Sequence, residues 1–111
     1  MSSQHLRHLV LLKFKEGVDR EAAAREISVE LAKLPSQIPF LAYNFGADLG
    51  LDPERNHDYA LVADFPDREA YDTYAKHPAH IHAITTAIKP VLAPGGRVAV
   101  QFRIPAKAPR L

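Results

Sequence analysis

The stretch LRHLVLLKFK, residues 6–15, decides the fold of this 111-residue chain. Its alternating positions form two faces that are both apolar in the middle. These faces consist of Leu6, His8, Val10, Leu12 and Phe14 on one side and of Arg7, Leu9, Leu11 and Lys13 on the other. An antiparallel strand with one face in water alternates apolar and polar residues instead. We therefore expect a strand that is covered on both faces.

The elements that follow have the order β-α-β-β-α-β. Asp19 is the predicted N-cap of the first helix and Asp67 that of the second, because a short acidic side chain accepts hydrogen bonds from free N–H groups there. After the first strand we predict a helix over about 20–34, strands over about 41–49 and 57–65, helices over about 67–76 and 79–87, and a strand over 98–104.

The last predicted strand follows the turn-forming tripeptide Pro-Gly-Gly at 94–96. We expect its apolar residues to point inward and its polar residues outward. The apolar set is Val98, Val100, Phe102 and Ile104, and the polar set is Arg97, Gln101 and Arg103.

This order predicts an α+β, ferredoxin-like fold, with a four-stranded antiparallel sheet and helices on one face only. The helices leave the second apolar face of the first strand bare. Its simplest cover is the sheet of a second copy, so we expect a homodimer with facing sheets, a dimeric α/β barrel. We expect residues 1–111 to form one domain, with a core over about 6–104 and a loosely held tail over 105–111.

Composition narrows the class of protein. Fourteen basic residues against 13 acidic ones give a formal charge of +1, and the basic residues are scattered, so no nucleic-acid partner is indicated. The chain has no cysteine, which excludes thiolate catalysis and is compatible with a reducing compartment. The apolar run before Lys13 is too short for a signal peptide or a membrane span. We expect a cytoplasmic protein without membrane contact.

Residues 71–82, YDTYAKHPAHIH, concentrate groups that exchange protons near pH 7. Tyr74, His77 and His80 flank the helix break at Pro78, and the predicted fold directs His8 toward the same region. A neutral imidazole accepts a proton from a carbon acid, and a phenol donates to the enolate oxygen that forms. We identify His80 as the candidate base and Tyr74 as the candidate donor, with no metal or organic cofactor.

Two more residues, His57 and Tyr59, complete the candidate site, and each histidine in it also has a structural interpretation. His57 and Tyr59 lie where the third strand begins; with His8 and His77 they form the predicted substrate-binding set. Each histidine has an alternative structural role, such as holding the helix break to the sheet. His77 and His80 have the i,i+3 spacing of metal ligands, but Pro78 lies between them and no third ligand has a helical spacing, so we predict no metal site.

The segments RHLVLLKFK, HDYALVADF and REAYDTYAKHPAH, together with IKPVL, resemble the stress-responsive A/B-barrel (Dabb) family of dimeric α/β barrels. The similarity runs from about Leu6 to Phe102. It implies the ferredoxin-like fold and the dimer. In a plant branch that cyclises polyketides by an aldol condensation without a cofactor, a histidine and a tyrosine match His80 and Tyr74. In that branch a histidine of the first strand matches His8. The branch also has a histidine at the position where this chain has Tyr59.

Three hypotheses about function follow, and they leave open whether the protein is an enzyme. The first is a dimer with a hydrophobic pocket that binds a small organic carbonyl or polyketide-like compound, with acid/base activity of the aldol-cyclase type. The second is a non-enzymatic, stress-related oligomer in which the histidines are structural. The third is a cofactor-independent monooxygenase-like barrel that holds a flat aromatic substrate.

Overall fold

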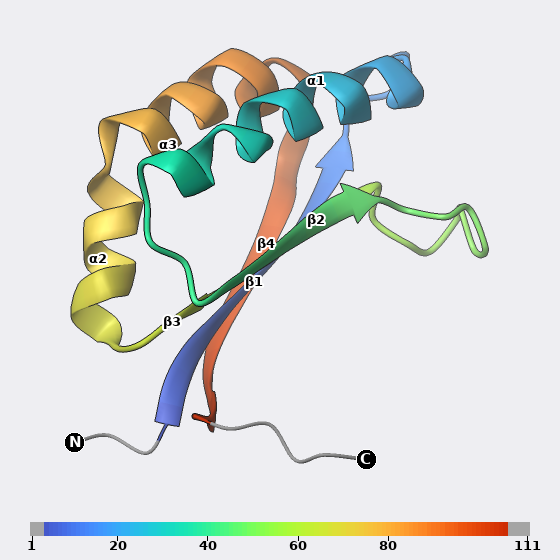
Figure 1. Ribbon diagram of the computed structural model, residues 1–111. Coiled ribbons are helices and arrows are strands. Elements are labelled where there is room, and N and C mark those ends of the chain that lie inside the picture. Colours follow the sequence, from blue (N-terminus) through green and yellow to red (C-terminus); the bar gives the residue numbers. More distant parts are fainter. Residues whose placement is uncertain (1–3, 107–111) are drawn as a thin grey trace.

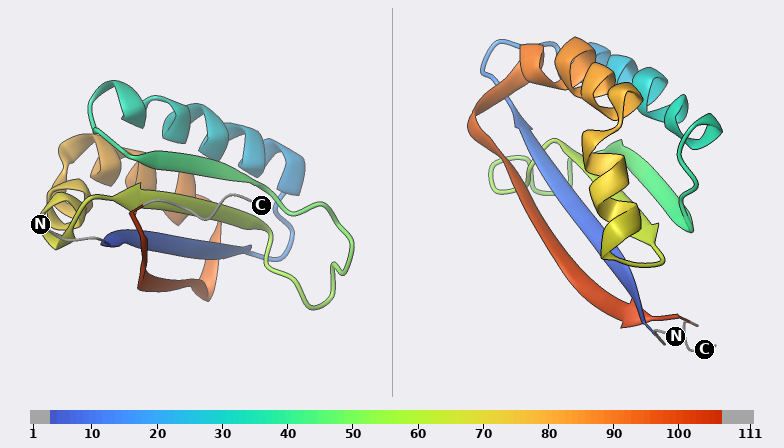
Figure 2. Two further views of the ribbon diagram at one scale, coloured as in Figure 1. Left: turned by 60° about the horizontal axis from the view of Figure 1, so that its bottom comes forward. Right: turned by 90° about the vertical axis from the view of Figure 1, so that its left-hand side faces the viewer.

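The computed structural model describes residues 4–106 and confirms the predicted fold (Figure 1). Four antiparallel strands form one sheet in the order β2-β3-β1-β4, and the helices cover one of its faces (Figure 2). The strands are β1 (Gln4–Phe14), β2 (Ala42–Ala47), β3 (Tyr59–Phe65) and β4 (Leu92–Pro105). The helices are α1 (Arg20–Ala32), α2 (Arg68–Lys76) and α3 (Pro78–Ala83), with short helical turns η1 (Leu34–Ser36), η2 (Ile84–Ile88) and η3 (Lys89–Val91).

The predicted helix starts are confirmed by their caps. The Asp19 carboxylate accepts a hydrogen bond from the Ala22 amide at 3.1 Å, and the Asp67 carboxylate accepts one from the Ala70 amide at 2.9 Å. Each bond satisfies an N–H group that has no partner inside its helix. The last predicted helix is α-helical only to Ala83, and the chain then continues as the π-helical turn η2 to Ile88.

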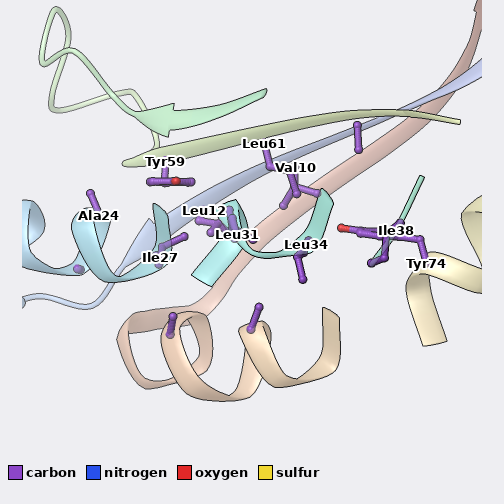
Figure 3. Close-up of a cluster of buried hydrophobic side chains, with 14 of the residues drawn as sticks. Val10, Leu12, Ala24, Ile27, Leu31, Leu34, Ile38, Tyr59, Leu61 and Tyr74 are labelled. Atoms are coloured by element: carbon purple, nitrogen blue, oxygen red, sulfur yellow. The ribbon is translucent and has the colours of Figure 1, made fainter. Parts of the chain in front are cut away.

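The core lies between the sheet and the helices (Figure 3). Alternate residues of β1 are buried from Leu6 to Phe14, so one of its two apolar faces lies against the core and the other is only partly covered. α1 contributes a stripe at helical spacing that includes Ile27 and Leu31. Packing of this stripe on β1 and β3 holds the helices to one side of the sheet.

β4 begins six positions before the predicted start and includes the Pro-Gly-Gly segment that we expected to form a turn. Gly95 has a φ of +67°, which favours glycine, and the pairing register of β1 and β4 shifts between Leu12 and Phe14. At Gly96 a Cβ atom would lie 2.5 Å from the Lys13 carbonyl oxygen. The glycines therefore let the strand continue around an irregularity. Only the pairing of β4 with β1 distinguishes this irregular strand from a turn.

The orientation expected for β4 is wrong. Gln101 pairs with His8 and Val100 with Leu9, and paired residues of neighbouring strands share a face. The polar residues of β4 therefore lie on the helix side of the sheet, and the apolar ones lie on the open side. Val98, Val100 and Phe102 are 44–50% exposed there. β4 is an edge strand that the helices do not cover, so the residues on its helix side, Arg97, Gln101 and Arg103, stay exposed and are polar.

Two further expectations concern the chain ends and membranes. Pro105 and Ala106, assigned to a loose tail, are described, and Pro105 is the last residue of β4; residues 107–111 of that tail lie outside the described part. Within residues 4–106, no helix is long and apolar enough to cross a membrane.

Candidate functional site

Two imidazoles and two phenol rings meet where β1 faces α2 and α3. The ring centroids of Tyr74 and His80 are 4.1 Å apart, and those of His8 and Tyr74 are 5.8 Å apart. The ring of Tyr71 lies 5.1 Å from that of His8. His8 and Tyr74 are only 2% and 1% exposed. We call these four residues the His–Tyr cluster.

The break between α2 and α3 places Tyr74 beside His80. His77 precedes Pro78 and has an extended backbone, with φ −65° and ψ 133°, because a residue before proline is kept out of the helical region. The chain therefore leaves α2 and starts α3 in a new direction. Tyr74 lies in the last turn of α2 and His80 in the first turn of α3, so this change of direction brings the two rings together.

His80 presents a free basic nitrogen. Its Nδ1 lies 3.2 Å from the Ala75 carbonyl oxygen, which only accepts, so Nδ1 carries the proton and Nε2 keeps its lone pair in the neutral ring. Burial lowers the pKa of His80, although the bond to Ala75 opposes this effect. A neutral imidazole with a free Nε2 is the form that a general base requires.

His8 has the opposite arrangement of proton and lone pair. The amide nitrogen of Gln101 donates to His8 Nδ1 at 2.8 Å, which leaves the proton on Nε2. The pKa of His8 is lowered to about 4, mainly by burial and to a smaller extent by the charges of Arg97 and His80. His8 is therefore a neutral hydrogen-bond donor at pH 7.

The Tyr74 hydroxyl is buried and has no hydrogen-bond partner among the described residues. Figure 3 shows the side chain extending from α2 with its oxygen directed toward the core. Burial is the main reason that the pKa of Tyr74 is raised. A protonated phenol without a partner in a buried position is uncommon, because such a group loses its bond to water on folding. The cluster thus contains an unused donor.

Two hollows reach the His–Tyr cluster from different sides. A hollow of about 330 Å³ has Tyr74 and His77 in its wall, together with apolar side chains such as Ile38 and Phe65. A second hollow, of about 410 Å³, is lined by Leu6, Arg68, Tyr71, Gln101, Phe102 and Arg103. A small organic molecule in either hollow would touch one of the cluster's phenol rings.

Of the other predicted site residues, His77 shares a hollow with Tyr74, whereas His57 and Tyr59 lie elsewhere. His77 Nδ1 accepts a hydrogen bond from the Ala79 amide at 3.0 Å and so caps α3. His57 lines a separate hollow beside Asn56. Tyr59 is buried with its hydroxyl 2.7 Å from that of Ser28, and Figure 3 shows it far along the core from Tyr74. The structure therefore brings His8, Tyr74 and His80 together, without His57 and Tyr59.

Two residues next to the predicted set escaped sequence reasoning. Tyr71 was visible in the histidine-rich stretch, one helical turn before Tyr74, and this spacing was the signal that could have found it. Gln101 depends on how β4 pairs with β1, which no local pattern reveals. In the part of the chain from Gln4 to Ala106, no three histidine or acidic side chains are grouped so that they could hold a metal ion.

The sheet order, the helices on one face and the two-faced β1 define a ferredoxin-like α+β domain whose sheet has one open apolar face. The chain belongs to the stress responsive A/B barrel domain (Dabb) family, whose model matches residues 6–104. It is 29% identical over 82 residues to the stress-response A/B barrel domain-containing protein HS1 of Arabidopsis thaliana, with 72% of this chain and 74% of HS1 covered.

Solved structures agree with this assignment. A dimeric ferredoxin-like protein of unknown function from Thermobifida fusca YX is 37% identical, with a TM-score of 0.80 and 94% of each chain covered. A hydroxynitrile lyase from Passiflora edulis is 18% identical, with a TM-score of 0.74, covering 97% of this chain and all (100%) of the lyase chain. At that identity the likeness to the lyase shows the fold alone.

Proposed function

We propose that this Dabb-family protein is a homodimer in which each copy binds a small organic carbonyl or polyketide-like compound at the His–Tyr cluster. One observation carries the proposal: among residues 4–106 the buried Tyr74 hydroxyl has no hydrogen-bond partner, and the Tyr74 ring lies 4.1 Å from that of His80, centroid to centroid. A bound carbonyl oxygen would accept the hydrogen bond that Tyr74 lacks. The apolar walls of the adjoining hollow suit the remainder of such a ligand.

The chemistry that fits this arrangement is cofactor-free proton transfer of the aldol-cyclase type. His80 Nε2 removes a proton from the carbon next to the carbonyl group, and the electron pair moves onto the oxygen as an enolate. The Tyr74 hydroxyl donates to that oxygen. The enolate carbon then attacks a second carbonyl group, whose oxygen becomes an alkoxide and takes the proton from His80 while the first carbonyl group re-forms; alternatively His80 returns the proton to the carbon. General-base catalysis of this kind contributes about 10²–10⁴ in rate.

The dimer is supported by the open face of the sheet. Leu9, Leu11 and Val62 lie on it with Val98 and Val100 of β4. An apolar face of this kind indicates an interaction surface. The Thermobifida fusca relative is described as dimeric, and we propose that the open sheets of two copies pack in the same way here. We also propose a cytoplasmic location, which cell fractionation would test.

A non-enzymatic oligomer is the second candidate, and the backbone bonds of two histidines favour it. His77 caps α3, and His80 donates to the carbonyl group of Ala75. In this alternative the histidines hold the helix break in place. The two candidates differ in the role of His80 Nε2. In the first it removes a proton from the ligand, and in the second it has no role.

The decisive experiment measures ligand binding and proton exchange together. The wild type, His80→Ala and Tyr74→Phe are examined by thermal shift against aliphatic and aromatic β-dicarbonyl compounds, and deuterium uptake at the carbon between the carbonyls is followed by NMR. We expect stabilisation of the wild type and a loss of catalysed exchange by about 10² or more in His80→Ala.

His82→Ala is the matched control, because His82 lies on the same helix with a side chain that is 69% exposed. It should leave binding and exchange unchanged. If no compound shifts the melting curve of the wild type, and His80→Ala changes stability alone, the structural oligomer is the correct interpretation.

A further inference from the structure

His77 presents a hydrogen-bond donor that the break between α2 and α3 holds in place. Its Nδ1 accepts a hydrogen bond from the Ala79 amide at 3.0 Å, and an amide N–H only donates, so the neutral ring carries its proton on Nε2. Among residues 4–106 this Nε2–H group has no hydrogen-bond or ion-pair partner. The capping bond therefore fixes the ring and leaves its N–H group free.

The His77 ring and Tyr74 lie in the wall of the same hollow, the one of about 330 Å³. Tyr74 is in the last turn of α2 and His77 follows three positions later, so the two side chains are neighbours at the end of this helix. The His77 amide donates to the Tyr74 carbonyl oxygen at 3.1 Å, which fixes the spacing of the two residues. Ile38, which is drawn beside Tyr74 in Figure 3, belongs to the same wall. One hollow thus adjoins two side chains that can each donate a hydrogen bond.

The charges around this hollow are negative. Asp67 and Glu69, at the start of α2, lie in its wall and are exposed. Glu69 has no ion pair among residues 4–106. No lysine or arginine of the described chain lines the hollow. A carboxylate on the ligand would meet like charges without a compensating cation, which weakens its binding. The hollow therefore suits an uncharged ligand.

We propose that the ligand of the His–Tyr cluster is an uncharged compound with two carbonyl groups separated by one carbon, and that His77 Nε2–H binds the second carbonyl oxygen. Tyr74 binds the first. This inference rests on the proposed function, names its substrate class and gives His77 a role in binding besides the cap. A carbon between two carbonyl groups is more acidic than a carbon beside one, because the electron pair left behind spreads over both oxygens.

Two donors suit the enolate of such a compound. When His80 Nε2 removes the proton from the carbon between the carbonyl groups, negative charge develops on both oxygens. Tyr74 donates to one oxygen and His77 to the other, so each charge meets a hydrogen bond that is already in place. Because the bond to Ala79 holds the His77 ring, ligand binding does not have to immobilise it.

Two ligands that differ in one carbonyl group test the inference. 4-Phenylbutan-2-one has a CH₂ group where 1-phenylbutane-1,3-dione has the carbonyl group next to the ring. Both are titrated at pH 7 into the wild type and His77→Ser by calorimetry. Serine is a strong N-cap, so His77→Ser keeps a bond to the Ala79 amide, but its short side chain does not replace Nε2–H. We expect it to weaken diketone binding about tenfold and monoketone binding by less than about twofold.

His82→Ser is the matched control. His82 lies on α3 with a side chain that is 69% exposed, and it lines neither hollow beside the cluster, so both affinities should stay unchanged. Benzoylacetate, which has a carboxylate where the diketone has its acetyl group, tests the charge. At low ionic strength it should bind the wild type about twofold or more weakly than the diketone does, and Glu69→Gln should reduce this difference.

Other outcomes overturn the inference in distinguishable ways. Equal weakening of both ketones by His77→Ser, or no weakening, excludes His77 as a donor to the ligand. Tighter binding of benzoylacetate than of the diketone excludes an uncharged ligand. In both cases the proposed function stands if the diketone binds the wild type and His80→Ala loses the catalysed deuterium exchange. If no compound binds the wild type, both fail. His77→Thr, a second capping residue without an imidazole, replaces His77→Ser if the serine variant has a lower melting temperature.

Discussion

At the scale of single residues, Tyr74 and Tyr59 form a natural comparison. Both are 1% exposed, but the Tyr59 hydroxyl bonds Ser28 whereas the Tyr74 hydroxyl has no partner among the described residues. A buried polar group without a hydrogen bond lowers stability, and proteins keep such groups mainly where they serve a function. The unpartnered phenol beside His80 is therefore the feature most simply explained by a bound ligand.

Replacing each tyrosine with phenylalanine should change stability in opposite directions. We expect Tyr74→Phe to raise the free energy of unfolding by about 1 kcal/mol, because it removes a buried hydroxyl without a bond. Tyr59→Phe should lower it by about 1 kcal/mol, since Ser28 loses its partner. Urea denaturation of both variants measures the difference. A loss of stability in Tyr74→Phe would show that the hydroxyl is bonded in solution, for example to water.

His8 should make the protein sensitive to acid. Its pKa is about 4 in the folded protein against an ordinary value of 6.5, mainly because of burial. The unfolded chain therefore binds more protons between these two pH values, so the free energy of unfolding should fall as the pH is lowered through this window. The shift corresponds to a loss of about 3 kcal/mol at most.

Denaturation curves at pH 7, 5.5 and 4.5 check this expectation. His8→Phe should be less stable than the wild type at pH 7, because Gln101 loses its partner, but its stability should fall less on acidification. His82→Gln, at a largely exposed position, should follow the wild type. If the wild type and His8→Phe have parallel pH profiles, His8 is not the residue that titrates.

At the scale of elements, the pairing of β1 with β4 depends on a glycine. Gly96→Ala would place a Cβ atom 2.5 Å from the Lys13 carbonyl oxygen and 2.8 Å from that of Ala93. Backbone atoms cannot move aside as a flexible side chain can. We expect a loss of about 2 kcal/mol in the free energy of unfolding, the usual size of an overpacking effect.

Gly46→Ala is the matched control for Gly96→Ala. Gly46 also lies in a strand, its φ is not positive, and nothing lies within 4 Å of the position that a Cβ atom would take. The control should change stability by less than about 0.5 kcal/mol. Chemical denaturation compares the two, and equal effects would mean that loss of glycine flexibility, and not the contact with Lys13, is responsible.

The helical elements were more predictable than the strands at the sheet edge. Asp19, Asp67 and Pro78 act on neighbours within a few residues, so their roles follow from the sequence. The start of β4 does not, because its Pro-Gly-Gly segment is compatible with both a turn and an irregular strand. Pairing with β1 decides between them, and this pairing joins residues that are far apart in the chain.

At the scale of the whole molecule, the open face of the sheet should hold two copies together. We expect Val100→Lys to give monomers at micromolar concentration, because the charge would be buried without a partner at the centre of the interface. Val29→Lys is the control, since Val29 is 59% exposed on α1, on the other side of the molecule. Sedimentation velocity distinguishes the two, and a wild type that sediments as a monomer would contradict the homodimer.

The sequence alone determined the strand and helix order, the caps, the break at Pro78 and the two-faced first strand, because each of these depends on residues near one another in the chain. It also singled out His8, Tyr74 and His80. Tertiary structure alone decided which way β4 faces. It also decided the tautomer of His8, because the hydrogen bond that sets this tautomer comes from Gln101, 93 positions away in the chain. It also left the Tyr74 hydroxyl without a hydrogen-bond partner among residues 4–106. Strand register and burial produce these features, since both arise only when distant segments pack together.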